Sequence, residues 1–118
     1  MVTIYGIKNC DTMKKAFAWL EANGIAYDFV DYKKADVAAS HLADWNRRAG
    51  WKLLLNTRGL MWKKLSDEER ADVDESKALV LMSEYPSLIK RPVADSGTTL
   101  LVGFDVERYG AAFTEAGK

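Results

Sequence analysis

The sequence predicts an α/β fold in which a mixed four-stranded sheet is interrupted by a helical insertion. Three observations support this: a strand–helix–strand pattern at the start of the chain, a helical middle, and a hairpin followed by a helix. The chain has 118 residues, of which 48% are apolar and 29% charged, and this is enough to bury a core without disulfides. We therefore expect a single domain over residues 1–118, with the helical insertion at approximately 36–85.

The first unit of the chain has the pattern of a βαβ motif. Residues 2–7 are β-branched and aromatic and predict a buried strand, and residues 25–32 alternate as a second one. Between them Asp11 or Thr12 is the expected N-cap of a helix that stops at Gly24. The apolar face of this helix recurs at helical spacing: Met13, Ala16, Phe17 and Leu20. A crossover of this kind predicts that the two strands are parallel.

The middle of the chain begins with one long helix and a break. Asp36 is the expected cap, and the helix closes near Gly50. Its inward residues are predicted to be Val37, Leu42 and Trp45. The next apolar stretch has no clear period, and Asn56 to Gly59 predict a break in it.

Two further helices are predicted after this break. Residues 66–69, SDEE, have the pattern of a capping box. Asp74 can cap the second helix, which stops before Pro86. Its inward residues are expected to be Leu79, Met82 and Val80.

The end of the chain completes the predicted sheet. Residues 91–104 contain two short apolar runs around Asp95–Gly97, which indicates a hairpin, and a final helix starts at about Asp105. The element order is therefore βαβ, a helical insert, then ββα. This is the thioredoxin-like order with a helical insertion.

Cys10 is the only cysteine, and it lies where the first strand meets the first helix. This fold places its reactive sulfur at that junction. Pro92 opens the first strand of the hairpin, where the fold carries a cis-proline beside the cysteine. The Lys90–Arg91 pair is therefore expected next to Cys10, although Arg91 could also be an ordinary surface arginine.

The position of Cys10 favours thiolate chemistry. The helix N-terminus, its free N–H groups and the cations of Lys8, Lys14 or Arg91 can lower the thiol pKa. The alternative is that Cys10 is a small buried hydrophobe, as lone cysteines often are. The same groups form an anion site. Its expected members are Lys8, Asn9, Asp11, Thr12, Arg58 and Pro92, with Arg58 either solvated in its loop or facing the site.

Composition excludes several classes of function. Seventeen basic residues balance seventeen acidic ones, so no net field recruits nucleic acid or an anionic membrane. One cysteine excludes an internal disulfide, and with one histidine it disfavours a zinc site. The N-terminus lacks the pattern of a signal peptide, and no segment is long enough to span a bilayer. We expect a cytoplasmic protein without bound cofactor, nucleic acid or membrane partner.

Four motifs, YGIKNCDTMKKA, NTRG, LIKRPV and LVGF, together resemble the YffB branch of the family of glutaredoxin-dependent arsenate reductases and Spx regulators. The resemblance covers essentially the whole chain. It implies a thioredoxin-like domain, a catalytic cysteine at Cys10, an oxyanion-binding arginine at Arg91 and a second arginine at Arg58. It also implies a glutathione-dependent thiol reductase that acts on a small oxidised thiol or an oxyanion, with glutaredoxin as a further candidate partner.

The sequence also departs from this family. Arsenate reductases carry an arginine where this chain has Gly103 or Phe104, and a histidine where it reads Gly6–Lys8. Fewer cations disfavour efficient arsenate reduction, which remains one alternative function. Spx regulators often carry a C-x-x-C switch, but Met13 occupies its second position here, so an intramolecular disulfide is excluded. A Spx-like protein-binding module that docks on RNA polymerase is the other alternative.

Overall fold

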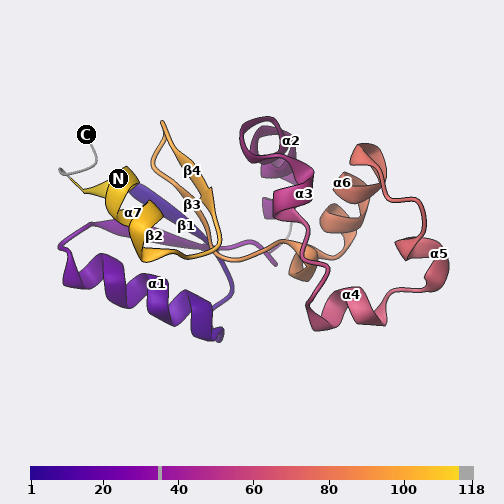
Figure 1. The fold of residues 1–118 in the computed structure, drawn as a ribbon, viewed down its shortest axis with the longest axis horizontal. Helices are drawn as coiled ribbons and strands as arrows, with labels where there is room; N and C mark the ends of the chain where they lie inside the picture. Colours follow the sequence, from indigo (N-terminus) through magenta and orange to yellow (C-terminus); the bar gives the residue numbers. More distant parts are fainter. Residues whose placement is uncertain (35, 115–118) are drawn as a thin grey trace. The chain divides into compact units, whose positions relative to one another are not determined.

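The computed structural model describes residues 1–34 and 36–114, which form two compact units. The first unit consists of Met1–Asp31 and the chain from Arg91 onward, and the second runs from Tyr32 to Lys90 (Figure 1). The second unit is wider at both ends than the predicted insertion. Its two ends are joined because the Tyr32 hydroxyl donates a buried hydrogen bond to the Ile89 carbonyl, at 2.7 Å.

The first unit contains the sheet. Its elements are β1 Val2–Gly6, α1 Asp11–Ala22, β2 Tyr27–Asp31, β3 Val93–Asp95, β4 Leu100–Val102 and α7 Val106–Phe113. The strand order is β2-β1-β3-β4. β1 is parallel to β2, whereas the β1–β3 and β3–β4 pairs are antiparallel. The prediction of a thioredoxin-like, mixed four-stranded sheet is confirmed.

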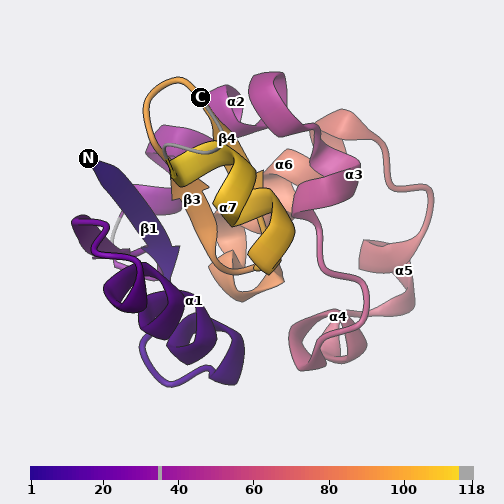
Figure 2. The same cartoon turned by 60° about the vertical axis from the view of Figure 1, so that its left-hand side comes forward.

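Both helices of this unit pack on one face of the sheet. Ile4 lies between Phe29 of β2 and Ala94 of β3 in the strand register. The buried residues of this core come from all layers: Val2, Ile4, Met13, Ala16, Leu20, Ala94 and Tyr109. Figures 1 and 2 show α1 and α7 beside the strands that carry these residues. The predicted apolar face of α1 is therefore the face that packs on the sheet.

The start of α1 differs from the prediction. Cys10 is the N-cap, with an extended backbone (φ −133°, ψ 131°), and Asp11 is the first helical residue. The expectation of Asp11 or Thr12 as cap was wrong because the chain leaves the extended conformation one residue earlier. At the other end Gly24 has φ 65°, a conformation that glycine adopts without strain, and it stops the helix as predicted.

The second unit is a set of short helices. They are α2 Val37–Ala49, α3 Trp51–Leu54, α4 Leu60–Lys64, α5 Asp67–Arg70, α6 Glu75–Glu84 and the 3-10 turn η1 Pro86–Leu88. Residues 55–59 separate α3 from α4, so the predicted break is confirmed. Within the described ranges no helix combines the length and apolar character that a bilayer crossing needs.

The capping residues of these helices agree with the prediction more closely than the residues predicted to face inward. Ser66 and Glu69 form both bonds of the capping box, and the Asp74 carboxylate accepts from the Lys77 N–H. Val80 was expected to face inward but is 55% exposed, because the buried face of α6 is formed by Ala78, Leu81 and Met82.

Candidate active site around Cys10

Cys10 connects the sheet to the first helix. β1 ends at Gly6, and α1 begins directly after Cys10, whose carbonyl accepts the Lys14 N–H at 3.0 Å. The side chain is partly buried and packs against the core of the first unit. The sulfur is thus held at the N-terminus of a helix whose backbone dipole favours negative charge.

Arg91 reaches Cys10 through the pairing of β3 with β1. Val93 lies opposite Tyr5, so the residues before β3 lie beside the segment that follows β1. The Arg91–Pro92 peptide bond is cis, as predicted, and Pro92 is fully buried. The Pro92 carbonyl accepts the Gly103 N–H at 2.8 Å, which ties this loop to the end of β4.

The surroundings of Cys10 lower its pKa below the ordinary value of a thiol. Desolvation by burial is the largest single effect and raises the pKa, but the N–H of Met13, the guanidinium of Arg91 and the N–H of Thr12 together outweigh it. Arg91 acts both as a hydrogen-bond donor and through its charge. These donors therefore favour the negatively charged thiolate over the neutral thiol.

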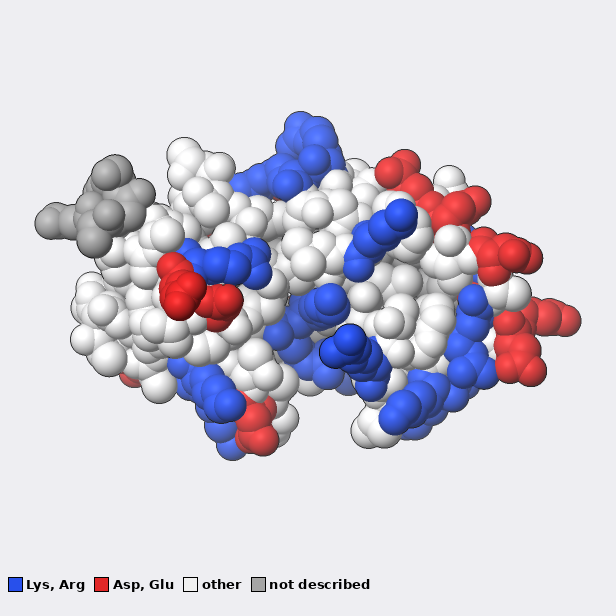
Figure 3. Space-filling model, in the orientation of Figure 1, with Lys and Arg blue, Asp and Glu red and all other residues white. Residues whose placement is uncertain are grey.

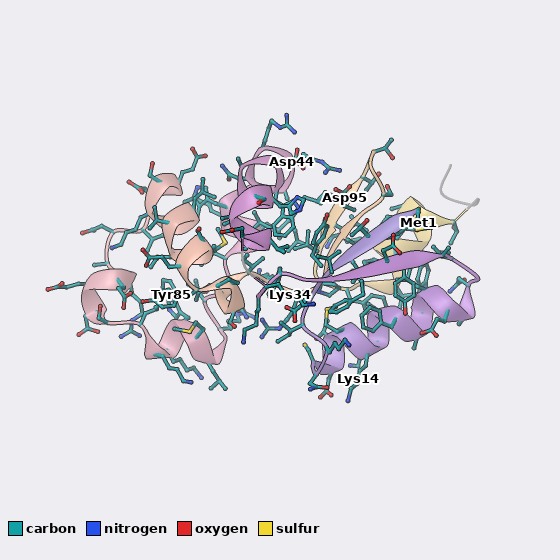
Figure 4. The ribbon with its side chains drawn as sticks, turned by 180° about the vertical axis from the view of Figure 1, so that it is seen from behind. Met1, Lys14, Lys34, Asp44, Tyr85 and Asp95 are labelled. Atoms are coloured by element: carbon teal, nitrogen blue, oxygen red, sulfur yellow. The ribbon has the colours of Figure 1, made fainter. Side chains whose placement is uncertain are left out.

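The other residues expected around the thiol have different surroundings. Lys8, Asn9 and Asp11 are exposed, and Thr12 is partly buried. Lys14 is also exposed on the first turn of α1 (Figure 4). The cation among the main causes of the shift of the Cys10 pKa is Arg91, whereas the sequence had also offered Lys8 and Lys14.

Arg58 and Lys90 belong to the second unit. Both line a cavity there, and the Arg58 N–H donates to the Asn56 side-chain oxygen at 3.0 Å. Of the Lys90–Arg91 pair, only Arg91 is part of the unit that holds Cys10. The role of Arg58 as a ligand of the Cys10 substrate therefore stays a prediction.

Two features of the site were missed in the sequence. The Met13 N–H stabilises the thiolate, although Met13 was predicted only as a core residue. The spacing could have revealed it, because the N–H groups two and three residues after an N-cap point toward the cap side chain. Gly6 is the other feature: a Cβ atom there would lie 2.4 Å from the Met13 sulfur, so a side chain at this position would force the Met13 thioether to move.

The arrangement gives a nucleophilic sulfur beside a guanidinium and two N–H donors. Such a group can attack a disulfide or another electrophile, and the donors can hold an anionic substituent. In the part of the chain that the structure describes, no three histidine, cysteine, aspartate or glutamate side chains are grouped as metal ligands.

Similar solved structures share this fold over nearly their whole length. The YFFB protein is 46% identical, with a TM-score of 0.91, over 97% of this chain and 100% of its own. An arsenate reductase (ArsC) related protein from Brucella melitensis is 48% identical, with a TM-score of 0.75, over 94% of this chain and 92% of its own.

Sequence relatives agree with the structural ones. An uncharacterized protein of Haemophilus influenzae is 38% identical over 96% of this chain and 99% of its own. The global transcriptional regulator Spx of Streptococcus pneumoniae is 24% identical over 94% of this chain and 84% of its own. The model of the ArsC family matches residues 5–112, which include both Cys10 and Arg91. This chain therefore belongs to the ArsC family.

Proposed function

We propose that the protein is a thiol-based reductase in which Cys10 is the nucleophile and glutathione is the co-substrate. The observation that supports this most directly is the group of donors around the sulfur. Arg91, Met13 and Thr12 lower the Cys10 pKa despite partial burial, which a purely structural cysteine does not require. Membership of the ArsC family and the similarity to an arsenate reductase related protein support the same class of chemistry.

The proposed cycle has two exchange steps. The Cys10 thiolate attacks the glutathione sulfur of a mixed disulfide RSSG, forms a Cys10–glutathione disulfide and releases RS⁻, which takes up a proton. A second glutathione thiolate then attacks the glutathione sulfur of that disulfide, forms GSSG and restores the Cys10 thiolate. The sum is RSSG + GSH → RSH + GSSG. Since Cys10 is the only cysteine of the chain, an external thiol has to perform the second step.

The residues next to Cys10 have proposed roles in binding. Arg91 holds a carboxylate of glutathione or an anionic group of the substrate, and the N–H groups at the start of α1 assist. Pro92 fixes the backbone beside the sulfur. Lys8, Asn9 and Asp11 are exposed at the rim and are proposed to contact the peptide part of the substrate.

The test is glutathione-coupled reduction of a small mixed disulfide. Cys10→Ser should abolish turnover and retain the fold. Arg91→Ala should weaken glutathione binding by about 1.5–3 kcal/mol, and Arg91→Lys should recover part of this because a point charge does not reproduce a bidentate fork. Lys14→Gln, an exposed cation on the same helix, is the matched control and should behave like the unchanged protein. Full turnover by Cys10→Ser would exclude the proposed mechanism.

A protein-docking role is the second candidate, and it is favoured by the Spx relatives that align over 94% of this chain. A docking protein would tolerate Cys10→Ala without loss of function, whereas a reductase would not.

Arsenate reduction is the third candidate function, and it is tested by supplying arsenate in place of the disulfide. Gly103 and Phe104 occupy the region of an arginine in arsenate reductases, so we expect slow arsenate reduction.

A further inference from the structure

Gly6 is the last residue of β1 and precedes the segment that carries Cys10. It is buried, and it is not among the glycines with positive φ. Its backbone continues the strand in a conformation that any residue can adopt. A reason for glycine at this position therefore has to come from the space around it.

The space beside Gly6 is filled by the Met13 side chain. A Cβ atom at Gly6 would lie 2.4 Å from the Met13 sulfur and 2.5 Å from its terminal methyl, far inside van der Waals contact. Met13 is fully buried in the core that α1 shares with the sheet. Positions 6 and 13 thus share one space, and in this chain Met13 occupies it.

Met13 also acts on the thiol through its backbone. It is the third residue of α1, and its N–H is the strongest of the groups that stabilise the Cys10 thiolate. An N–H at this position of a helix points toward the cap residue, which here is Cys10. One residue therefore packs against the strand with its side chain and faces the sulfur with its N–H.

Arg91 approaches Gly6 from another segment, but less closely. Its Cβ atom lies 3.6 Å from the position that a Cβ at Gly6 would take, which is an ordinary van der Waals contact. A methyl group at Gly6 would displace Met13 and could leave Arg91 where it is. The steric effect of a substitution at Gly6 is thus directed at α1.

The charged groups near the thiol are separate from this contact. They include Lys8, Asp11 and Lys14 around the start of α1, Asp31 at the end of β2 and Arg91 before β3. Figure 3 shows basic and acidic side chains at the surface where α1 begins. Exchanges among glycine, alanine and methionine leave all of these charges in place. A change in thiol reactivity would then reflect where the N–H groups lie.

We propose that Gly6 and Met13 are positioning residues for Cys10: the Met13 thioether, packed against Gly6, holds the first turn of α1 so that its N–H groups face the sulfur. Met13 is fully buried, so it acts through the helix and not on the substrate. This inference rests on the proposed role of Cys10 as the nucleophile. It is tested on the thiol alone, without glutathione, so it can fail while the reductase proposal stands, and the reverse is also true.

The experiment measures the rate of Cys10 alkylation by iodoacetamide against pH in the full chain. Gly6→Ala should move the midpoint upward by about 0.5–1 pH unit, because displaced N–H donors stabilise the thiolate less and its pKa rises. Met13→Ala should move the midpoint in the same direction, since the first turn loses its contact with the strand. In the Met13→Ala background, Gly6→Ala should add less than about 0.3 pH unit, because the new Cβ then has room.

Two controls separate positioning from a general loss of stability. Gly110→Ala makes the same exchange in α7, where a new Cβ meets nothing within 4 Å, and should leave the midpoint in place. Leu20→Ala removes a fully buried side chain from a later turn of α1. It should lower the unfolding temperature but move the midpoint by less than about 0.3 pH unit.

All variants are measured in sucrose, which favours the folded state, and circular dichroism verifies that each is folded. If Gly6→Ala does not fold, Met13→Ala, which adds no atoms, decides the question by itself. The proposal is overturned if Met13→Ala keeps the midpoint of the unchanged protein, or if Gly6→Ala raises it equally in both backgrounds. It is also overturned if Leu20→Ala raises the midpoint as much as Met13→Ala does.

Discussion

The Cys10 side chain shows how few groups are needed to change the chemistry of a thiol. Burial opposes its ionisation, and the N–H groups of Met13 and Thr12 with the Arg91 guanidinium favour it more strongly. Because the pKa is lowered, the thiolate forms as pH rises through a value below that of a free thiol. Reactivity toward an electrophile should therefore appear at lower pH than for free cysteine.

We expect the alkylation rate of Cys10, measured against pH with iodoacetamide, to have its midpoint below about 8.5. Arg91→Ala should move the midpoint upward, because both a donor to the thiolate and a positive charge are lost. Lys14→Gln should move it much less, since Lys14 is exposed and the main cation acting on the thiol is Arg91. A midpoint at or above that of free cysteine in the unchanged protein would contradict this account.

Gly6 is a second position where one residue decides the local structure. A Cβ at Gly6 would lie 2.4 Å from the sulfur and 2.5 Å from the terminal methyl of Met13, which is fully buried. Gly6→Ala should therefore destabilise the protein by about 1–3 kcal/mol as the thioether repacks. Gly110→Ala in α7, where a new Cβ meets nothing within 4 Å, should stabilise it by about 0.5–1 kcal/mol. Urea denaturation of both variants tests the difference, and equal effects would exclude a steric cause.

At the scale of elements, the helices of the second unit depend on their caps because they are short. Asp74 accepts the Lys77 N–H at 2.9 Å, whereas Asp36 makes no side-chain capping bond and has φ 65°. Two aspartates that look alike in the sequence thus have different roles. One supplies an acceptor, and the other occupies a backbone conformation that favours glycine.

Substitution of these two aspartates should separate the roles. Asp74→Ala should cost about 1 kcal/mol, and Asp74→Asn, which keeps an acceptor, should cost less. Asp36→Gly should be neutral or stabilising within about 1 kcal/mol, since it removes a residue with a side chain from the left-handed region. Thermal unfolding gives both values. A clear loss of stability in Asp36→Gly would show that its carboxylate has a role that the backbone does not explain.

At the scale of the whole molecule, the chain leaves the sheet unit at Asp31 and returns at Arg91. The residues between form a unit whose ends meet, since Tyr32 donates to the Ile89 carbonyl in a buried site. An insertion with adjoining ends can be accommodated between two strands without displacing them. Cys10 and Arg91 lie in the sheet unit, whereas the cavity lined by Arg58 and Lys90 lies in the insertion.

We expect Tyr32→Phe to destabilise the second unit by about 1–3 kcal/mol, because the buried Ile89 carbonyl loses a donor. Tyr85→Phe is the matched control: this hydroxyl, labelled in Figure 4, donates to Glu69 at 3.1 Å in a less buried place and should cost less than about 1 kcal/mol. Amide hydrogen exchange resolves the two units separately. Faster exchange should be concentrated in residues 37–89 for Tyr32→Phe, and uniform acceleration would argue against this local role.

Local signals in the sequence determined most of the fold. The apolar spacing of Met13, Ala16 and Leu20, the SDEE box and the stop at Gly24 act within a few residues, and the structure has each of them as predicted. The position of Cys10 between a strand and a helix is a local signal of the same kind. Together with the element order, these signals were enough to predict the thioredoxin-like sheet and the position of Arg91 beside Cys10.

Tertiary structure alone decided which groups surround the thiol and which residues form the cavity. The β1–β3 pairing selects Arg91 rather than the nearer lysines Lys8 and Lys14 as the cation at Cys10. Likewise, the bridge between Leu55 and Ile89 joins segments far apart in the sequence, so that Arg58 and Lys90 line the same cavity. The physical reason is the same in both cases: interactions of charges and cavities depend on distance in space. Strand pairing sets that distance, and spacing along the chain does not.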